Sequence, residues 1–363
     1  MPELEDYIIG IDIGGTNIEA DLIDSKTYKP LRKPIRRTFK EPLPDRELSN
    51  EDKLQYAEEA LEHVGKIIND YCEFHQEIRK DCKVGIAVPG IISNDGKILV
   101  GVVFGNFHLR EAVEEYVREQ YGIKAKIHVE NDANCGAYTH GEGQTLMIGT
   151  NLGSALNING KLIGRNTSVK DDWQDYCIFD EAGFAIRFDK DKDTAWDIFK
   201  DYANEERFND YFKNLAKQNT ESPNYVRLEQ LLGGKAIPRI FGLVYGRDDV
   251  SLDARLLNEI TDGADVKSVA EKTWEIEGKL LGYAVATLKN EAQQERYKCN
   301  IRDFHIGGKV ALALHHMKSF AEESARAYCE EFGCTPDFKL RKSKHDNPNI
   351  IGAAIAYIRA NKY

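Results

Sequence analysis

Glu130-Asn131-Asp132-Ala133-Asn134 is the stretch around which we expect the chain to fold. It directly follows residues 125–129, whose alternation of apolar and polar side chains predicts a short strand. Buried acids and amides cost several kcal/mol unless they are hydrogen-bonded or face a polar ligand. The pattern therefore fits either an Asx-rich turn that caps a helix over 133–141 or a ligand site at the mouth of a strand.

An internal repeat lies on either side of this stretch. Gly15-Thr16-Asn17-Ile18 returns as Gly149-Thr150-Asn151-Leu152. Each copy stands between two apolar alternating runs, which is the pattern of a β-hairpin with a glycine-bearing turn. Two similar halves with a carboxylate between them predict a cleft.

The first hairpin carries two features that suit a nucleotide. Gly14 and Gly15 let the backbone approach an anion closely, and the Thr16 hydroxyl is a donor to phosphate oxygens. A plain hairpin would also need glycines in its turn. Asp12 stands inside an otherwise apolar strand over 7–13, where a buried acid either holds Mg²⁺ through water or makes a structural hydrogen bond.

Composition narrows the classes of function. The chain has 363 residues, 42% of them hydrophobic, and a net charge of −11. Length and composition allow two domains of a soluble globular protein, and the negative charge argues against broad binding of nucleic acid or anionic membranes. No apolar run approaches the roughly 18 residues of a membrane span, and residues 1–6 are acidic where a secretory leader is basic. We expect a cytoplasmic protein.

The seven cysteines predict neither a disulfide framework nor a zinc site. They form no C-x-x-C pair and their number is odd. We expect them to be reduced and mostly structural. Cys135 lies beside the central stretch, but no supporting base is evident nearby, which favours core packing over a nucleophile.

Three further positions are candidate contacts. Gly90 ends an apolar strand over 84–91, where it either approaches a substrate or simply forms a turn. Asn106 is a polar residue among aromatics, either a ligand contact or a helix entry. Gly307 and Gly308 follow a strand and precede a helix over 311–332, a place where a base or ribose can lie against the backbone.

With these pieces in order, the chain resembles the ROK family of sugar kinases in the actin-like ATPase superfamily. The resemblance rests on landmarks in the family's order: 10–17, 85–90, 130–134, 149–153, 181–183, 228–229 and 306–308. It implies an α/β fold of two ribonuclease H-like domains flanking a cleft. The smaller domain would comprise residues 1–129 with the C-terminal helix 346–363, and the larger one residues 130–345.

The resemblance also implies roles for individual residues. Asp132 would be the general base for a hexose or N-acetylhexosamine, and Asp12 would organise Mg²⁺. Sugar contacts would come from Gly90, Asn106, Asn131, Glu181 and Glu229. ATP would be bound by Asp12, Gly14, Gly15, Thr16, Asn17, Gly149, Thr150, Asn151, Gly307 and Gly308. Phosphoryl transfer needs such positioning together with a proton acceptor. The family also implies a homodimer.

Two departures from the family pattern affect the expected site. Phe184 stands where relatives commonly carry His, and the cysteine cluster that binds zinc in many of them is missing, so we expect a zinc-free member. Asn151 replaces a usual glycine in the second phosphate loop.

Two other classes of function are weighed against a kinase. A ROK-type repressor would carry a DNA-binding helix-turn-helix ahead of the first phosphate motif, where only six residues precede Tyr7. A catalytically silent sugar sensor or actin-like assembly protein is the remaining alternative.

Overall fold

The computed structural model describes residues 7–31, 34–40, 48–100, 104–149, 152–163, 182–189, 194–218, 225–246, 264–294 and 298–361. These residues form two compact units. The N-terminal unit comprises the described residues of 7–141 and 345–361, and the C-terminal unit those of 142–344.

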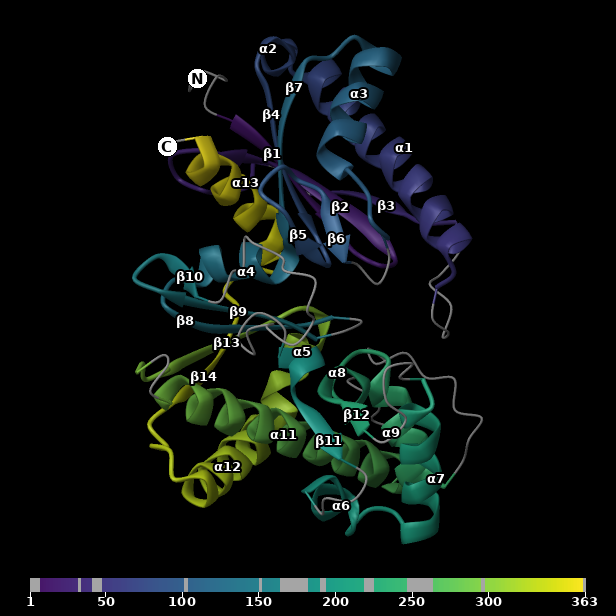
Figure 1. The fold of residues 1–363 in the computed structure, drawn as a ribbon, viewed down its shortest axis with the longest axis vertical. Helices are drawn as coiled ribbons and strands as arrows, with labels where there is room; N and C mark the ends of the chain where they lie inside the picture. The colour runs from purple at the N-terminus through teal and green to yellow at the C-terminus, as the bar shows by residue number, and fades with distance from the viewer. Residues whose placement is uncertain are drawn as a thin grey trace. The chain divides into compact units, whose positions relative to one another are not determined.

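A five-stranded sheet forms the centre of the N-terminal unit (Figure 1). Its strands, in chain order, are β1 (Tyr7–Ile13), β2 (Asn17–Asp24), β3 (Ile35–Thr38), β4 (Cys82–Val88) and β7 (Ala125–Asn131). They lie in the order β3-β2-β1-β4-β7, with an antiparallel meander on one side and parallel pairs of β1, β4 and β7 on the other.

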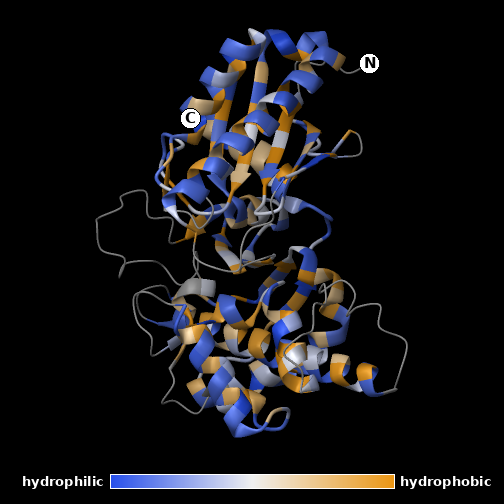
Figure 2. Cartoon of the chain, turned by 90° about the vertical axis from the view of Figure 1, so that its right-hand side faces the viewer, coloured by the Kyte–Doolittle hydropathy of each residue, from blue (hydrophilic) through white to orange (hydrophobic). Residues whose placement is uncertain are grey.

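Both faces of this sheet are covered. Because successive side chains of a strand point to opposite faces, Ile9 and Ile11 of β1 pack in the core that α1 (Asn50–Phe74) and α3 (Leu109–Tyr121) share. Ile8 points the other way and packs with α13 (Pro348–Asn361). Figure 2 shows the resulting pattern, in which hydrophobic strands lie behind helices with many hydrophilic residues.

Helix α13 lies unusually close to the sheet. A Cβ atom on Gly10 of β1 or on Gly85 of β4 would overlap the α13 carbonyl oxygens of Ile350 and Ala353, respectively. A Cβ atom on Gly352 of α13 would overlap the Cys135 carbonyl of α4 (Asp132–His140). The missing side chains therefore let backbone pack directly on backbone at three points.

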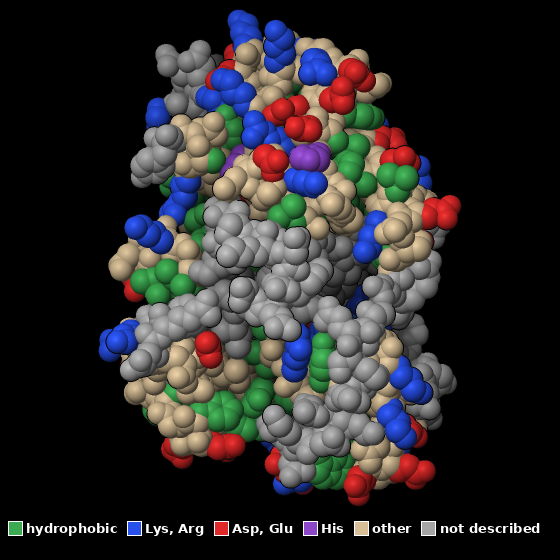
Figure 3. All heavy atoms as spheres, viewed as in Figure 1, with side chains coloured by type: hydrophobic (Ala, Val, Ile, Leu, Met, Phe, Trp, Pro, Cys, Tyr) green, Lys and Arg blue, Asp and Glu red, His purple; other side chains and the backbone are tan. Residues whose placement is uncertain are grey.

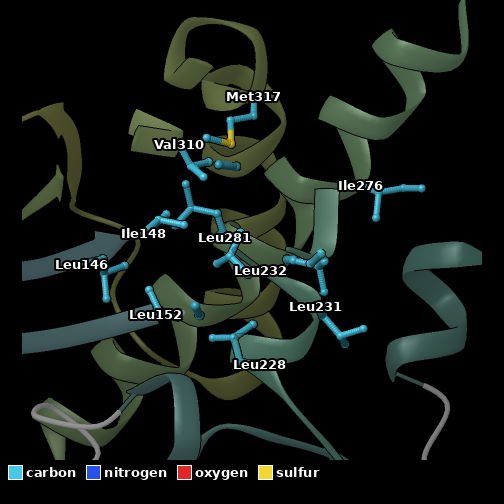
Figure 4. Packing of buried hydrophobic residues seen from close by; sticks show 14 of the residues in the cluster. Leu146, Ile148, Leu152, Leu228, Leu231, Leu232, Ile276, Leu281, Val310 and Met317 are labelled. Carbon is cyan, nitrogen blue, oxygen red and sulfur yellow. The ribbon is translucent and has the colours of Figure 1, made fainter. Parts of the chain in front are cut away.

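The C-terminal unit repeats the same strand arrangement. Its sheet contains β8 (Gly143–Ile148), β9 (Leu152–Ile158), β10 (Lys161–Ile163), β13 (Asp303–Gly307) and β14 (Lys339–Lys342), in the order β10-β9-β8-β13-β14. Again a meander continues into parallel pairs. Figure 4 shows leucines of β8 and β9 packed with α8 (Leu228–Leu231), α11 (Ala264–Gln293) and α12 (Leu314–Phe332).

Shorter elements connect these parts. In the N-terminal unit they are α2 (Gln76–Lys80), β5 (Ile91–Ile92) and β6 (Ile98–Val100). In the C-terminal unit they are α5 (Ala182–Ala185), β11 (Arg187–Asp189), α6 (Thr194–Phe199), α7 (Glu205–Ala216), β12 (Tyr225–Arg227), α9 (Ala236–Tyr245) and η3 (Lys309–Ala313).

The structure confirms both predicted hairpins, β1–β2 and β8–β9. The C-terminal helix lies in the N-terminal unit. The sequence placed the domain boundary between residues 129 and 130, whereas the division between the two compact units lies further along the chain. It falls between 141 and 142. Helix α4 packs against α13 through Cys135 and Gly352, so Asp132 lies in the N-terminal unit rather than in the larger domain.

Surface charge is mixed. On the face shown in Figure 3, acidic and basic side chains are interspersed rather than gathered by sign. None of the helices in the described part of the chain combines the length and apolar character that a bilayer span requires.

We predict that Gly85→Ala destabilises the protein by about 1–3 kcal/mol, because the added methyl group overpacks the contact with α13. Urea unfolding of the purified protein measures the change. Gly105→Ala is the matched control, since its Cβ would meet only the Lys53 side chain, at 3.7 Å. Equal stability of the two variants would contradict the close packing.

Glu277 of α11 is a buried acid in the core of the C-terminal unit. Its side chain is fully buried, and among the described residues neither carboxylate oxygen has a hydrogen-bond partner. Burial raises its pKa well above the ordinary value of 4.5. The folded protein therefore holds a proton that the unfolded chain releases above about pH 4.5.

Because the folded-state pKa is raised, this group stabilises the fold at low pH, and the contribution is lost as pH rises towards the folded-state pKa. We expect Glu277→Gln to remove a slope of about 1.4 kcal/mol per pH unit from the free energy of unfolding. Chemical unfolding between pH 5 and pH 8 measures it, with Glu323→Gln on the exposed side of α12 as control. An unchanged slope in Glu277→Gln would argue against a protonated Glu277.

Candidate active site

The candidate site lies where the parallel strands of the N-terminal unit end. In the register of the sheet, Asp12 of β1 and Glu130 of β7 flank Ala87 of β4 on either side. Strand β7 then runs directly into α4, whose first residue is Asp132. Ligands of open α/β sheets collect at this carboxyl edge.

The Glu130–Asn134 stretch is both a helix cap and a cluster of polar groups. The Asn131 Oδ1 accepts from the Asn134 amide at 3.0 Å, which caps α4. The Asn131 Nδ2 donates to the Gly90 carbonyl at 2.9 Å. Buried Glu130 accepts from the Asn131 amide at 3.0 Å and from Asn134 Nδ2 at 3.1 Å. The predicted cap is thus confirmed, and it fixes the backbone on both sides of Asp132.

The two aspartates are electrostatically linked. Removal from water raises the pKa of Asp132, against hydrogen bonds from its own amide and that of Ala133. The pKa of Asp12 is raised to about 7, first by burial and then by the charges of Asp132 and Glu19, against hydrogen bonds from Asn347 and Asn349. A carboxylate whose pKa is raised towards neutrality is a better proton acceptor.

Two amides from the start of α13 hold Asp12. The Asn347 Nδ2 donates to Asp12 Oδ2 and to Glu19 Oε2, both at 3.0 Å. The Asn349 Nδ2 donates to Asp12 Oδ1 at 3.2 Å. Sequence reasoning missed both asparagines, although their position at the beginning of the predicted C-terminal helix was a usable signal.

The predicted phosphate turn of the N-terminal unit is tightly hydrogen-bonded. The Gly14 amide donates to the Asn17 carbonyl at 2.9 Å, and the Thr16 carbonyl accepts from the Phe39 amide at 3.2 Å. The Asn17 Oδ1 accepts from Arg36 Nη2 at 2.7 Å. Gly14, Gly15 and Thr16 therefore lie between β1 and β2, and Asn17 is the first residue of β2, next to the end of Asp12's strand.

The predicted sugar contacts are only partly brought together. Gly90 adopts a φ of 127°, which suits glycine, and is joined to Asn131. Asn106 is exposed in the loop before α3. Glu181 and the side chain of Phe184 lie outside the described residues, as do Thr150 and Asn151 of the second phosphate turn.

The remaining candidates belong to the C-terminal unit. Glu229 of α8 lies 3.8 Å from Arg227 Nη1, and burial raises the pKa of Glu229 against the effect of that arginine. The Gly149 carbonyl accepts from the Gly234 amide at 2.7 Å. Gly308 follows Gly307 at the end of β13 with a φ of 81°, and a side chain there would overlap the backbone of Ile148. The positive φ and the close packing on Ile148 therefore explain why position 308 is a glycine.

The acidic side chains of the site suit magnesium, which needs few protein ligands, better than a metal that is held entirely by protein side chains. No group of three or more His, Cys, Asp or Glu side chains that could hold a metal occurs among the residues that the structure describes. Magnesium is typically bound through one or two carboxylates together with substrate phosphates and water. Asp12, beside the glycine turn, provides a carboxylate of this kind.

The two repeated sheets define the class of protein. Each has a three-stranded meander continued by parallel strands, and together they form the two ribonuclease H-like domains of the actin-like ATPase fold. Solved structures with this fold include a ROK hexokinase from Thermus thermophilus, at 19% identity, with a TM-score of 0.61 and coverage of 98% of this chain and 100% of that one.

Part of the chain also matches a family model by sequence. Residues 8–168 match the model of the ROK family, which confirms the resemblance that the motifs indicated. No curated protein matches the chain by sequence.

Two further solved structures show the range of ROK proteins with this fold. A Streptomyces griseus ROK glucokinase in complex with glucose and AMPPNP is 18% identical, with a TM-score of 0.64 and coverage of 96% and 98% of this chain and that one. A ROK transcriptional regulator, a homologue of the E. coli MLC protein, is 15% identical, with a TM-score of 0.63 and coverage of 98% and 78%.

We predict that Asn131→Ala lowers stability by about 1 kcal/mol, because it removes the cap of α4 and leaves the Gly90 carbonyl without its donor. Thermal unfolding followed by circular dichroism measures the loss. Asn204→Ala, which removes the corresponding cap of α7, provides a comparison of the same kind. An Asn131→Ala protein as stable as the wild type would contradict the capping role.

Proposed function

We propose that this protein is an ATP-dependent kinase that phosphorylates a hydroxyl group of a hexose or N-acetylhexosamine, with Asp132 as the general base. The observation that carries the proposal is the position of Asp132. It lies at the carboxyl ends of the parallel strands of the N-terminal sheet, its charge acts on Asp12, and it is fixed by the capped start of α4.

In the proposed reaction, Asp132 accepts the proton of the sugar hydroxyl as its oxygen attacks the γ-phosphorus of ATP. The bond from the γ-phosphorus to the bridging oxygen breaks, and ADP leaves. The raised pKa of Asp132 favours this transfer. Gly14 and Gly15 would bring backbone close to the phosphates. Magnesium, held through Asp12, would neutralise charge on the phosphates.

The positions of the other groups support a sugar as acceptor. One N–H and one lone pair of the Asn131 amide remain for a ligand, because the described hydrogen bonds use one of each. The partly buried carboxylate of Glu229 would bind a further hydroxyl. The Streptomyces griseus relative holds glucose and AMPPNP on the same fold.

The alternative is a catalytically silent sugar sensor or regulator. The fold that this chain shares with a ROK transcriptional regulator is the observation that favours it. A sensor would bind sugar without consuming ATP, so turnover separates the two functions.

Asp132→Asn tests the proposal. Loss of a general base is expected to lower kcat by roughly 10²-fold to 10⁴-fold. A coupled assay of ADP release over a panel of hexoses and N-acetylhexosamines gives the rate and identifies the sugar. Asp95→Asn, on an exposed turn, controls for the loss of a carboxylate and should leave kcat unchanged.

Two results would count against the kinase. Turnover by Asp132→Asn at the wild-type rate would exclude Asp132 as the base. Sugar binding by the wild-type protein in calorimetry, without ADP release for any sugar in the panel, would favour the sensor.

A further inference from the structure

The side-chain amide of Asn347, directly before α13, is hydrogen-bonded to two acids, Asp12 and Glu19. Asp12 of β1 and Glu19 of β2 are direct partners in the antiparallel register, so their side chains share the face of the sheet that α13 covers. Like charges directly opposite each other destabilise a strand pair. The Asn347 Nδ2 donates a hydrogen bond to each of these acids. Among the described residues, Asn347 is the one side chain that is hydrogen-bonded to both.

Asn347 is itself held in place by Asn349. Its Oδ1 accepts from the Asn349 amide at 3.2 Å, inside the first turn of α13. Asn349 completes the arrangement, since its Nδ2 donates to the other oxygen of Asp12 at 3.2 Å. Both oxygens of Asp12 therefore accept from amides, one directly before α13 and one in its first turn, and Gly10 allows this helix to lie close to β1.

Glu19 has a second restraint on its far side. Arg36 of β3 is its register partner, and the Arg36 Nε lies 3.6 Å from Glu19 Oε1. Asp12, Glu19 and Arg36 thus form a row across three strands beside the turn that carries Gly14 to Asn17. Within this row, Asn347 contacts the two acidic members, Asp12 and Glu19.

We propose that Asn347 is a positioning residue for phosphoryl transfer, which directs the Asp12 carboxylate toward the hydrated Mg²⁺ of the nucleotide and keeps Glu19 apart from it. This inference rests on the proposed function. Groups that orient a metal's ligands typically change affinity or activity by 10-fold to 100-fold when they are replaced. Asn347 touches neither nucleotide nor sugar in this role and acts through Asp12.

Asn347→Asp is the sharpest test, because it preserves the shape and the oxygen that accepts from the Asn349 amide. It replaces the two donated hydrogen bonds with a third carboxylate. We expect binding of Mg²⁺-AMPPNP, measured by isothermal titration calorimetry, to weaken by roughly 10-fold to 100-fold, and kcat to fall by a similar factor. The KM for the sugar should change less than twofold, as an order-of-magnitude expectation for a site acted on only through Asp12.

The double variant Glu19→Gln with Asn347→Asp distinguishes positioning from general damage. It removes one of the three carboxylates and restores an amide donor to the pair, so it should recover part of the lost Mg²⁺-AMPPNP affinity. Coupling of this kind is expected only between residues in contact. Asn361→Ala, at the other end of α13, is the matched control and should bind Mg²⁺-AMPPNP as the wild type does.

The outcomes separate this inference from the kinase proposal. Wild-type affinity for Mg²⁺-AMPPNP in folded Asn347→Asp, checked by thermal unfolding, would overturn the role of Asn347 even if the protein is a kinase. The role of Asn347 would also be overturned if the double variant bound Mg²⁺-AMPPNP as weakly as Asn347→Asp does, with no recovery of affinity. A wild-type protein that binds Mg²⁺-AMPPNP but turns over no sugar would instead count against the kinase, and the binding series would still decide the role of Asn347.

Discussion

The direct contact of α13 with the strands beneath it is the constraint on which the N-terminal unit depends. Gly10 and Gly85 have no side chain to separate the helix from β1 and β4, and Gly352 allows the same approach to α4. Such contacts fix distances closely because backbone cannot change rotamer to relieve a misfit. Helices α13 and α4, which are far apart in the sequence, are thereby held against each other and α13 against one face of the sheet.

This contact has an electrostatic consequence. The site gathers Asp12, Glu19 and Asp132, and the raised pKa of Asp12 reflects both burial and the charges of the other two acids. Amides rather than cations offset much of this repulsion next to Asp12, because Asn347 and Asn349 donate without neutralising its charge. A carboxylate that accepts hydrogen bonds from neutral amides, and is not paired with a cation, can still attract a hydrated metal ion.

The duplicated strand order explains why one chain carries two glycine turns. Each sheet begins with a pair of antiparallel strands and continues into parallel strands, and each glycine-bearing motif falls between the two strands of such a pair in the sequence. In the N-terminal unit the turn lies beside the acids. In the C-terminal unit Gly308, which follows β13, is explained by close packing on Ile148. Glycine at a landmark position is therefore weaker support for ligand binding than a carboxylate at a strand end.

The sequence by itself determined the two hairpins, the cap at Glu130–Asn134 and the resemblance to the ROK family, because these depend on local alternation, turn residues and short motifs. The sequence also indicated Asp132 as a candidate site residue, because the order of residues alone shows an acid that follows a predicted strand. The domain boundary and the asparagines on Asp12 were decided by tertiary structure alone. Residues 12 and 347 meet only because glycines far apart in the sequence allow α13 to lie on β1, and no local pattern encodes that contact.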